Sequence, residues 1–194
     1  MISDARIGAF WLWLKSKYGF NDNQIRKKTF SLAPFLSNKS SIQQGYLTSE
    51  PFLVEREAGF TPRVFLLADY GYPSYGAMVL ASSNVLKNNP EIVKAFVDAS
   101  IEGWRQYIYD DPSLGNELIM LENNEMKEDI LLQAIKKIRN YDLVSNEISK
   151  GLDIGLMTDI KWESFFKTMS INGVYEKDLE WRESFTLDFI NKEN

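Results

Sequence analysis

The stretch SIQQGYLTSEPF, at residues 41–52, carries the signals on which our fold prediction depends. Gly45 suits the left-handed position that closes a helix, and the residues after it are sufficient only for a brief strand. Ser49 or Glu50 can cap a new helix, because Pro51 fits a first helical turn, where a missing N–H costs least. We therefore expect polar side chains to gather where a strand ends and a helix begins, which is where open α/β sheets bind ligands.

Around this stretch the pattern predicts strands that alternate with helices. The predicted strands cover residues 5–10, 29–32, 46–48, 63–69 and 77–81. The predicted helices of this part cover residues 11–18, a short segment that reaches residue 44, and residues 51–58. Such alternation predicts an α/β fold with a small, mostly parallel sheet and helices on its faces.

The later part of the chain is predicted to be mainly helical. A first helix starts at Asn89-Pro90 and stops at the Asp110-Asp111-Pro112 run. Further helices are expected over residues 126–141, from Thr158 to just before Gly173, and after Asp178. Trp104, Trp162 and Trp181 fall on apolar helical faces and are expected in the core. These apolar faces are wide, yet few strands remain to cover them.

Composition excludes several kinds of function. The 194 residues are 44% hydrophobic and 25% charged, which is ordinary for a soluble globular protein of one or two domains. A formal charge of −5 argues against a nucleic-acid partner, since phosphate binding relies on clustered Lys and Arg. We interpret the one short basic run, Arg26-Lys27-Lys28, as a solvated face.

The chain contains neither Cys nor His. This removes disulfides, thiolate metal sites, imidazole triads and His-based proton relays. The carboxylates show no ordered metal-ligand spacing, so we expect no metal and no cofactor. No apolar run approaches a membrane span and no leader follows Met1, so the chain taken by itself would remain in the cytoplasm.

Four segments carry a resemblance to a known family: FWLWLK at 10–15, GYLTSEP at 45–51, VFLLADYG at 64–71 and NPEIVKAFVDAS at 89–100. They resemble the solute-binding proteins of ABC importers in the group of sulfonate, taurine and thiamine-pyrimidine receptors. The resemblance covers nearly the whole chain, in the expected order.

The resemblance implies a two-lobed, type II periplasmic-binding-protein fold that closes on a small molecule. Residues 1–75 resemble the second lobe, and residues 76–194 resemble the return segment that completes a first lobe otherwise missing here. It also implies a periplasmic location, a small polar or heteroaromatic solute bound in an interlobe cleft, and ABC permease subunits as partners, without insertion into the membrane. On this interpretation the chain is a fragment or the product of a mis-started reading frame, and it is not an enzyme.

Two alternatives stay open. The same group contains thiamine-pyrimidine biosynthetic enzymes, but these depend on a substrate histidine and a Cys-rich motif, neither of which occurs here. The chain could also be a degenerate half-protein that binds no ligand at all.

The candidate ligand-binding residues are Trp11, Tyr46, Thr48, Glu50 and Tyr75. Glu50 can hydrogen-bond a cationic or amide-bearing ligand, or it can simply favour the adjacent helix N-terminus. Tyr46 and Tyr75 can stack on a planar ligand, whereas loop aromatics also seal domain boundaries. Trp11 sits at the predicted strand-to-helix turn, and Thr48 can donate to a ligand oxygen or only cap the helix. Capping is the preferred interpretation for Ser49.

Overall fold

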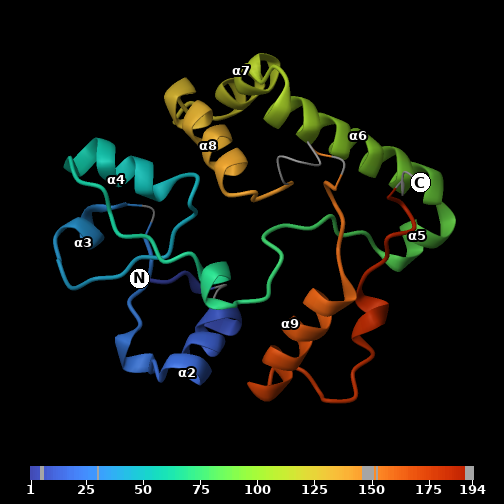
Figure 1. Cartoon of the computed structure of the whole chain (residues 1–194), viewed down its shortest axis with the longest axis horizontal. Helices are drawn as coiled ribbons and strands as arrows, with labels where there is room; N and C mark the ends of the chain where they lie inside the picture. The colour runs from blue at the N-terminus through green and yellow to red at the C-terminus, as the bar shows by residue number, and fades with distance from the viewer. Residues whose placement is uncertain (5–6, 30, 146–150, 152, 191–194) are drawn as a thin grey trace. The chain divides into compact units, whose positions relative to one another are not determined.

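The computed structural model of the chain is helical and describes residues 1–4, 7–29, 31–145, 151 and 153–190 (Figure 1). Within these ranges the β structure is limited to a single parallel bridge between Ile2 and Lys27. No sheet is formed by the described residues, so the prediction of an α/β fold with a parallel sheet is wrong.

Each predicted strand has another conformation where the structure describes it. Residues 7–11 form a π-helical turn, η1 (Ile7–Trp11), while residues 5–6 lie outside the described residues. The run at 63–69 is irregular until a 3-10 turn, η3 (Leu67–Tyr70), and residues 77–81 are irregular throughout. Residues 46–48 form turns that lead into a helix. Of the predicted strand at 29–32, residue 30 is not described and the others form no strand.

The chain divides into two compact units, which we describe separately. The first unit contains Met1–Ser74 and Thr158–Ser184, and the second contains Tyr75–Met157 and Phe185–Asn194. The division assigns residues 158–184 to the first unit, together with the part of the chain that we predicted to form one lobe. The identity of these units as lobes of a binding protein stays a prediction.

The first unit is built from short helices and turns. Its elements are η1, α2 (Leu12–Tyr18), η2 (Asp22–Gln24), α3 (Ala33–Leu36), α4 (Glu50–Ala58), η3, α9 (Asp159–Ile171) and η4 (Trp181–Ser184). Gly19 and Gly59 end α2 and α4 in the left-handed conformation, as the sequence predicts. Thr158 caps α9 by accepting a hydrogen bond from the backbone N–H of Lys161. Where a last helix was expected after Asp178, the residues described up to 190 contain the short turn η4 and no α-helix.

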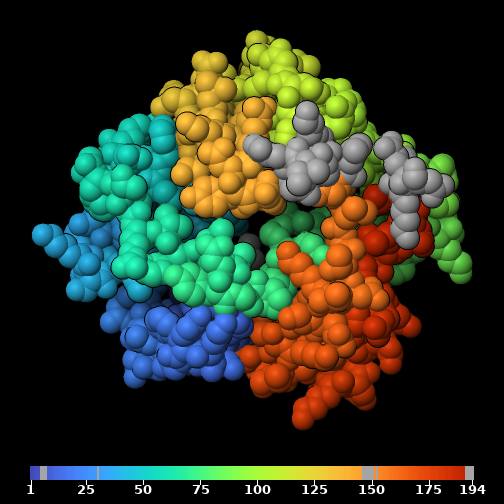
Figure 2. Space-filling view, in the orientation of Figure 1, coloured from blue at the N-terminus to red at the C-terminus, as the bar shows by residue number. Residues whose placement is uncertain are grey.

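The second unit contains four helices in its described part. They are α5 (Ser83–Asn88), α6 (Pro90–Tyr109), α7 (Ser113–Glu122) and α8 (Glu128–Asn140). The predicted starts at Pro90 and near residue 126 are confirmed, and α5 and α7 were missed. Helices α7 and α8 pack against each other, and their side chains are in close contact in Figure 2.

Each unit buries its own apolar residues. In the first unit these are Ile2, Trp11, Trp13, Leu32, Val54, Met169 and Trp181. In the second unit they are Val93, Ile108, Ile130, Leu131, Ile135 and Ile154. The core prediction is confirmed for Trp181 and wrong for Trp104, which is 45% exposed, while Trp162 is only half-buried. Among the described helices, none combines the length and apolar character that a membrane crossing requires.

Candidate functional site

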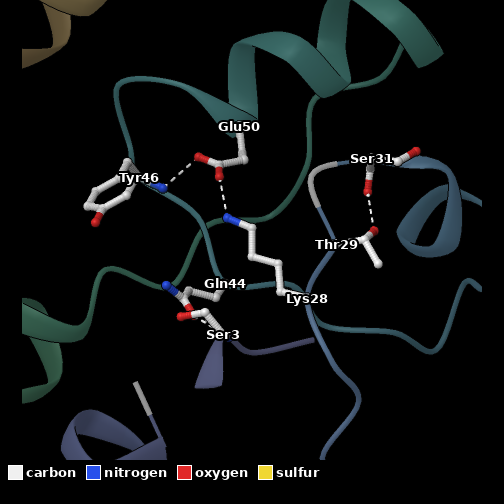
Figure 3. Close-up of polar contacts among 7 residues, drawn as sticks. All are labelled: Ser3, Lys28, Thr29, Ser31, Gln44, Tyr46 and Glu50. Carbon is white, nitrogen blue, oxygen red and sulfur yellow. Dashed lines mark hydrogen bonds and ion pairs between the residues drawn. The ribbon is translucent and has the colours of Figure 1, made fainter. Parts of the chain in front are cut away.

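The turn at residues 45–50 folds back on itself through Glu50, the first residue of α4. The carboxylate oxygen Oε2 of Glu50 accepts a hydrogen bond of 2.7 Å from the backbone N–H of Tyr46 (Figure 3). Gly45 permits this close approach, since a Cβ atom there would lie 2.9 Å from the Cβ of Glu50. The φ angle of Gly45 is not positive, so the prediction of a left-handed conformation is wrong. The turn requires glycine at this position because a side chain would collide with Glu50.

Lys28 completes this turn from a distant part of the chain. Its Nζ lies 2.6 Å from Oε1 of Glu50, and only 18% of the Lys28 side chain and 19% of the Glu50 side chain are exposed. The interpretation of residues 26–28 as a solvated face is therefore wrong for Lys28. It fits the exposed Lys27, which pairs with Asp4 at 3.1 Å. The backbone of Lys28 is fixed as well, because its N–H donates to the carbonyl of Ile2.

Gln44 anchors the start of the same turn. Its side-chain Oε1 accepts hydrogen bonds from the backbone N–H and the hydroxyl of Ser3, at 2.9 and 3.1 Å. Its own backbone N–H donates to the carbonyl of Met1. These residues form two hydrogen-bonded groups at the turn, Gln44 with Ser3 and Glu50 with Lys28 and Tyr46, and we call the five residues together the polar turn (Figure 3).

The predicted site residues of the first unit have different surroundings. Tyr46 is 57% exposed, and its ring points away from the Glu50 carboxylate in Figure 3. Thr48 is half-buried in the turn before α4. Ser49 occupies the position before the helix, but its side chain makes no capping bond, so the capping prediction is wrong. The structure brings Tyr46 and Glu50 into contact, and their role toward a ligand stays a prediction.

Trp11 is buried, and its indole N–H takes part in a polar contact separate from the polar turn. Only 7% of Trp11 is exposed, and its indole N–H donates to Oδ1 of Asp22 at 2.9 Å. Lys15 donates to the other oxygen of Asp22 at 2.8 Å. The hydrogen bond from Lys15, followed by that from Trp11, holds the pKa of Asp22 below its usual value. Sequence reasoning missed Asp22, although its spacing of seven residues from Lys15 is local.

Two further tyrosines lie on either side of the boundary between the two units in the sequence. Tyr72, in the loop after η3, packs on α2, with its ring centroid 5.3 Å from that of Trp13. Tyr75 begins the second unit, and it is half-buried there. Its predicted contact with a ligand stays a prediction.

The polar turn offers the groups that noncovalent binding of a small molecule uses. It has an ammonium group, an amide, a carboxylate and an exposed aromatic ring, and such sites fix ligands by a few polar contacts beside an aromatic surface. Throughout the described part of the chain, no group of three or more acidic residues could hold a metal ion. The polar turn is therefore the candidate ligand-contacting site of the first unit.

Comparison with known families assigns the chain to one of them. The NMT1/THI5-like family model matches residues 14–114, which is more than half of the chain and includes the polar turn from Lys28 to Glu50. The chain belongs to the NMT1/THI5-like family, in agreement with its resemblance to sulfonate and thiamine-pyrimidine solute-binding proteins. No curated protein and no solved structure matches the chain.

Proposed function

We propose that this chain is the substrate-binding component of an ABC importer. Its ligand would be a small polar or heteroaromatic solute, such as a thiamine-pyrimidine precursor or a sulfonate. The observation that carries this proposal is the family match over residues 14–114, because the matched segment contains Lys28, Gln44, Tyr46 and Glu50 of the polar turn. We propose Tyr46 and the polar turn as the ligand-contacting part of the first unit.

The chemistry of the turn supports binding without reaction. The exposed Tyr46 ring can stack on a planar solute, and the Lys28 side chain, held by Glu50, provides directional polar contacts. A biosynthetic enzyme is the second candidate, since the family name also covers an enzyme-like member. The chain has no imidazole and no thiol to supply the histidine and cysteines on which the related pyrimidine-forming enzymes depend.

Ligand-induced thermal stabilisation tests the proposed function. We expect at least one solute from a panel of 4-amino-5-hydroxymethyl-2-methylpyrimidine, taurine and an alkanesulfonate to raise the unfolding midpoint. At a concentration of about 100 times its Kd, a ligand stabilises the folded state by about 2.7 kcal/mol. Absence of any shift across the panel would support the non-binding alternative. Release of a pyrimidine product from a mixture of the protein with pyridoxal phosphate would instead support the enzyme.

Two tyrosine variants locate the binding. Replacing Tyr46 with Ala should reduce the ligand-induced shift, because the stacking surface is lost. Tyr141→Ala is the matched control, since Tyr141 is 48% exposed and lies at the end of α8 in the second unit. Equal shifts for wild type and Tyr46→Ala would remove Tyr46 from the proposed site.

The transport context is part of the same proposal. We propose a periplasmic location and ABC permease subunits as the partner that receives the solute. Fractionation of cells that express the native gene checks the location. Solute uptake that requires both this protein and a permease, measured in reconstituted vesicles, checks the partner.

A further inference from the structure

Both carboxylate oxygens of Glu50 in the polar turn already accept a hydrogen bond from within the protein. Each carboxylate oxygen of Glu50 already holds one donor, Lys28 on Oε1 at 2.6 Å and the Tyr46 N–H on Oε2 at 2.7 Å. The charge of Glu50 is thus compensated by a side chain that is itself only 18% exposed. A ligand does not meet a bare carboxylate at this turn.

The unused groups of the turn are donors. A lysine ammonium has three N–H donors, and that of Lys28 has one partner among the described residues, Glu50. The amide Nε2 of Gln44 has no partner in the described part of the chain, because only its Oε1 is bonded, to Ser3. Unpaired donors on a largely covered lysine favour a ligand group that accepts hydrogen bonds.

A cationic ligand meets an obstacle at the same place. To reach Glu50 it must share the carboxylate with the Lys28 ammonium or displace it, and two like charges at one carboxylate repel each other. This repulsion acts strongly because both side chains are largely removed from solvent.

We infer that Lys28 is a specificity-determining residue, which compensates Glu50 and makes the polar turn select uncharged or anionic hydrogen-bond acceptors over cations. The inference rests on the proposed function, since it concerns the ligand of that same site. It assigns Glu50 as the positioning residue for Lys28, which reverses the sequence-based expectation of a cation held by Glu50.

Three planar probes of nearly equal shape and different charge test this inference: benzoate, benzamide and benzamidine. Binding is followed by NMR titration of the Tyr46 backbone amide, which reports directly on Glu50. For the wild-type chain we expect benzoate and benzamide to bind at least about tenfold more tightly than benzamidine, a difference of about 1.4 kcal/mol. Lys28→Met should invert this order, because the Glu50 carboxylate, then without its ammonium partner, attracts the cation.

Two control variants separate charge selection from general damage. Lys27→Met removes the same charge from the neighbouring residue, whose side chain is 76% exposed, and should keep the wild-type order. The double variant Lys28→Met with Glu50→Gln removes both charges without leaving a covered carboxylate unpaired. It should lose the charge preference and bind benzamide best, which keeps the test decisive if Lys28→Met alone does not fold.

The possible failures are distinguishable. Tighter binding of benzamidine than of benzamide by the wild type, or an unchanged order in both Lys28 variants, would overturn the inference. It would also be overturned if no probe shifts the Tyr46 amide while a solute of the panel stabilises the protein, and the proposed function would then stand. If no solute of the panel stabilises the protein, the proposed function fails and the inference fails with it.

Discussion

Gly45 shows how a missing side chain shapes the polar turn. A Cβ at this position would meet Cγ and Cδ of Glu50 at 3.2 Å, in addition to the Cβ contact of 2.9 Å. The Cβ of Glu50 is attached directly to the first turn of α4, so it cannot move without the backbone. The start of α4 at Glu50 therefore depends on the close approach of Gly45 to Glu50.

Substitution of Gly45 by Ala should destabilise the protein by about 1–3 kcal/mol, the usual cost of overpacking. The measurement is the midpoint of urea denaturation, together with the NMR signal of the Tyr46 amide, which should shift as its bond to Glu50 weakens.

Gly103→Ala is the control for this prediction. Gly103 lies in the middle of α6, where an added Cβ would have no atom within 4 Å. The same substitution there should stabilise the protein by about 0.5–1 kcal/mol, because Ala is a better helix former than Gly. Equal effects at the two glycines would contradict the explanation based on space.

Asp22 makes the stability of the first unit depend on pH. Its pKa is lowered by the hydrogen bonds from Lys15 and then Trp11, so the folded state binds the proton less readily than the unfolded state. The stabilisation is therefore present above the usual value of 3.8 and is lost as the pH falls through the lower folded pKa. Asp22→Asn should destabilise the protein at neutral pH, and its difference from wild type should shrink well below pH 3.8.

Urea denaturation of both proteins across this pH range measures the effect. Asp4→Asn provides the control, since the Asp4 and Lys27 side chains are 71% and 76% exposed and such surface pairs contribute little. A constant difference between Asp22→Asn and wild type at all pH values would show that the charge of Asp22 is not the cause.

At the scale of single residues, the sequence located the turn but not the contacts that distant residues make with it. The GYLTSEP motif directed attention to Tyr46 and Glu50, which do touch, because residues four apart around a helix start are local neighbours. Lys28 could not be found in this way, since it is 22 residues from Glu50 and only the folded chain brings the two together. Trp11 was selected for its position at a turn, and its burial beside Asp22 depends on packing.

Among the elements, the longer helices α2, α4, α6, α8 and α9 were predicted near their observed bounds, whereas the short helix expected to reach residue 44 and the strands were wrong. Helix signals such as Pro90 at a first turn, Gly59 at an end and the capping residue Thr158 act within a few residues, so they can be recognised locally. A strand needs a partner from elsewhere in the chain. The apolar run at 63–69 has strand composition, but the described residues provide no partner strand for it.

The corner between α6 and α7 is held by a buried polar contact. The hydroxyl of Tyr107 donates to Oδ1 of Asn116 at 2.7 Å, and Asn116 is only 4% exposed. Gly115 lets the Tyr107 ring approach, because a Cβ there would lie 2.6 Å from the ring. The contact fixes the start of α7 against the end of α6.

Tyr107→Phe should destabilise the protein by about 1–3 kcal/mol, since it leaves the buried Asn116 oxygen without its donor. Tyr141→Phe is the control, because Tyr141 is 48% exposed and its hydroxyl has no partner among the described residues. Burial also raises the pKa of Tyr107, so the wild-type protein should lose stability as the pH rises above about 10, and Tyr107→Phe should lack this part of the decline. Equal stability of the two variants at neutral pH would contradict a structural role for the hydroxyl.

At the scale of the whole molecule, the chain forms two compact units that it enters more than once. It leaves the first unit after Ser74, returns at Thr158 and leaves again after Ser184. Each unit has its own buried residues, such as Val54 in the first and Ile108 in the second. The sequence suggested a division near residue 75, but the return of residues 158–184 to the first unit depends on contacts between distant segments, and no local pattern signals it.

Units with separate cores can open separately, so substitutions in one unit should leave the other protected. We expect Gly45→Ala to speed amide hydrogen exchange in α4 without changing it in α7 and α8, and Tyr107→Phe to speed exchange in α7 without changing it in α4. The double variant should show both increases, and its two effects should add to within about 0.5 kcal/mol. If either single substitution speeds exchange equally in both units, the units unfold together and the expectation of separate opening is wrong.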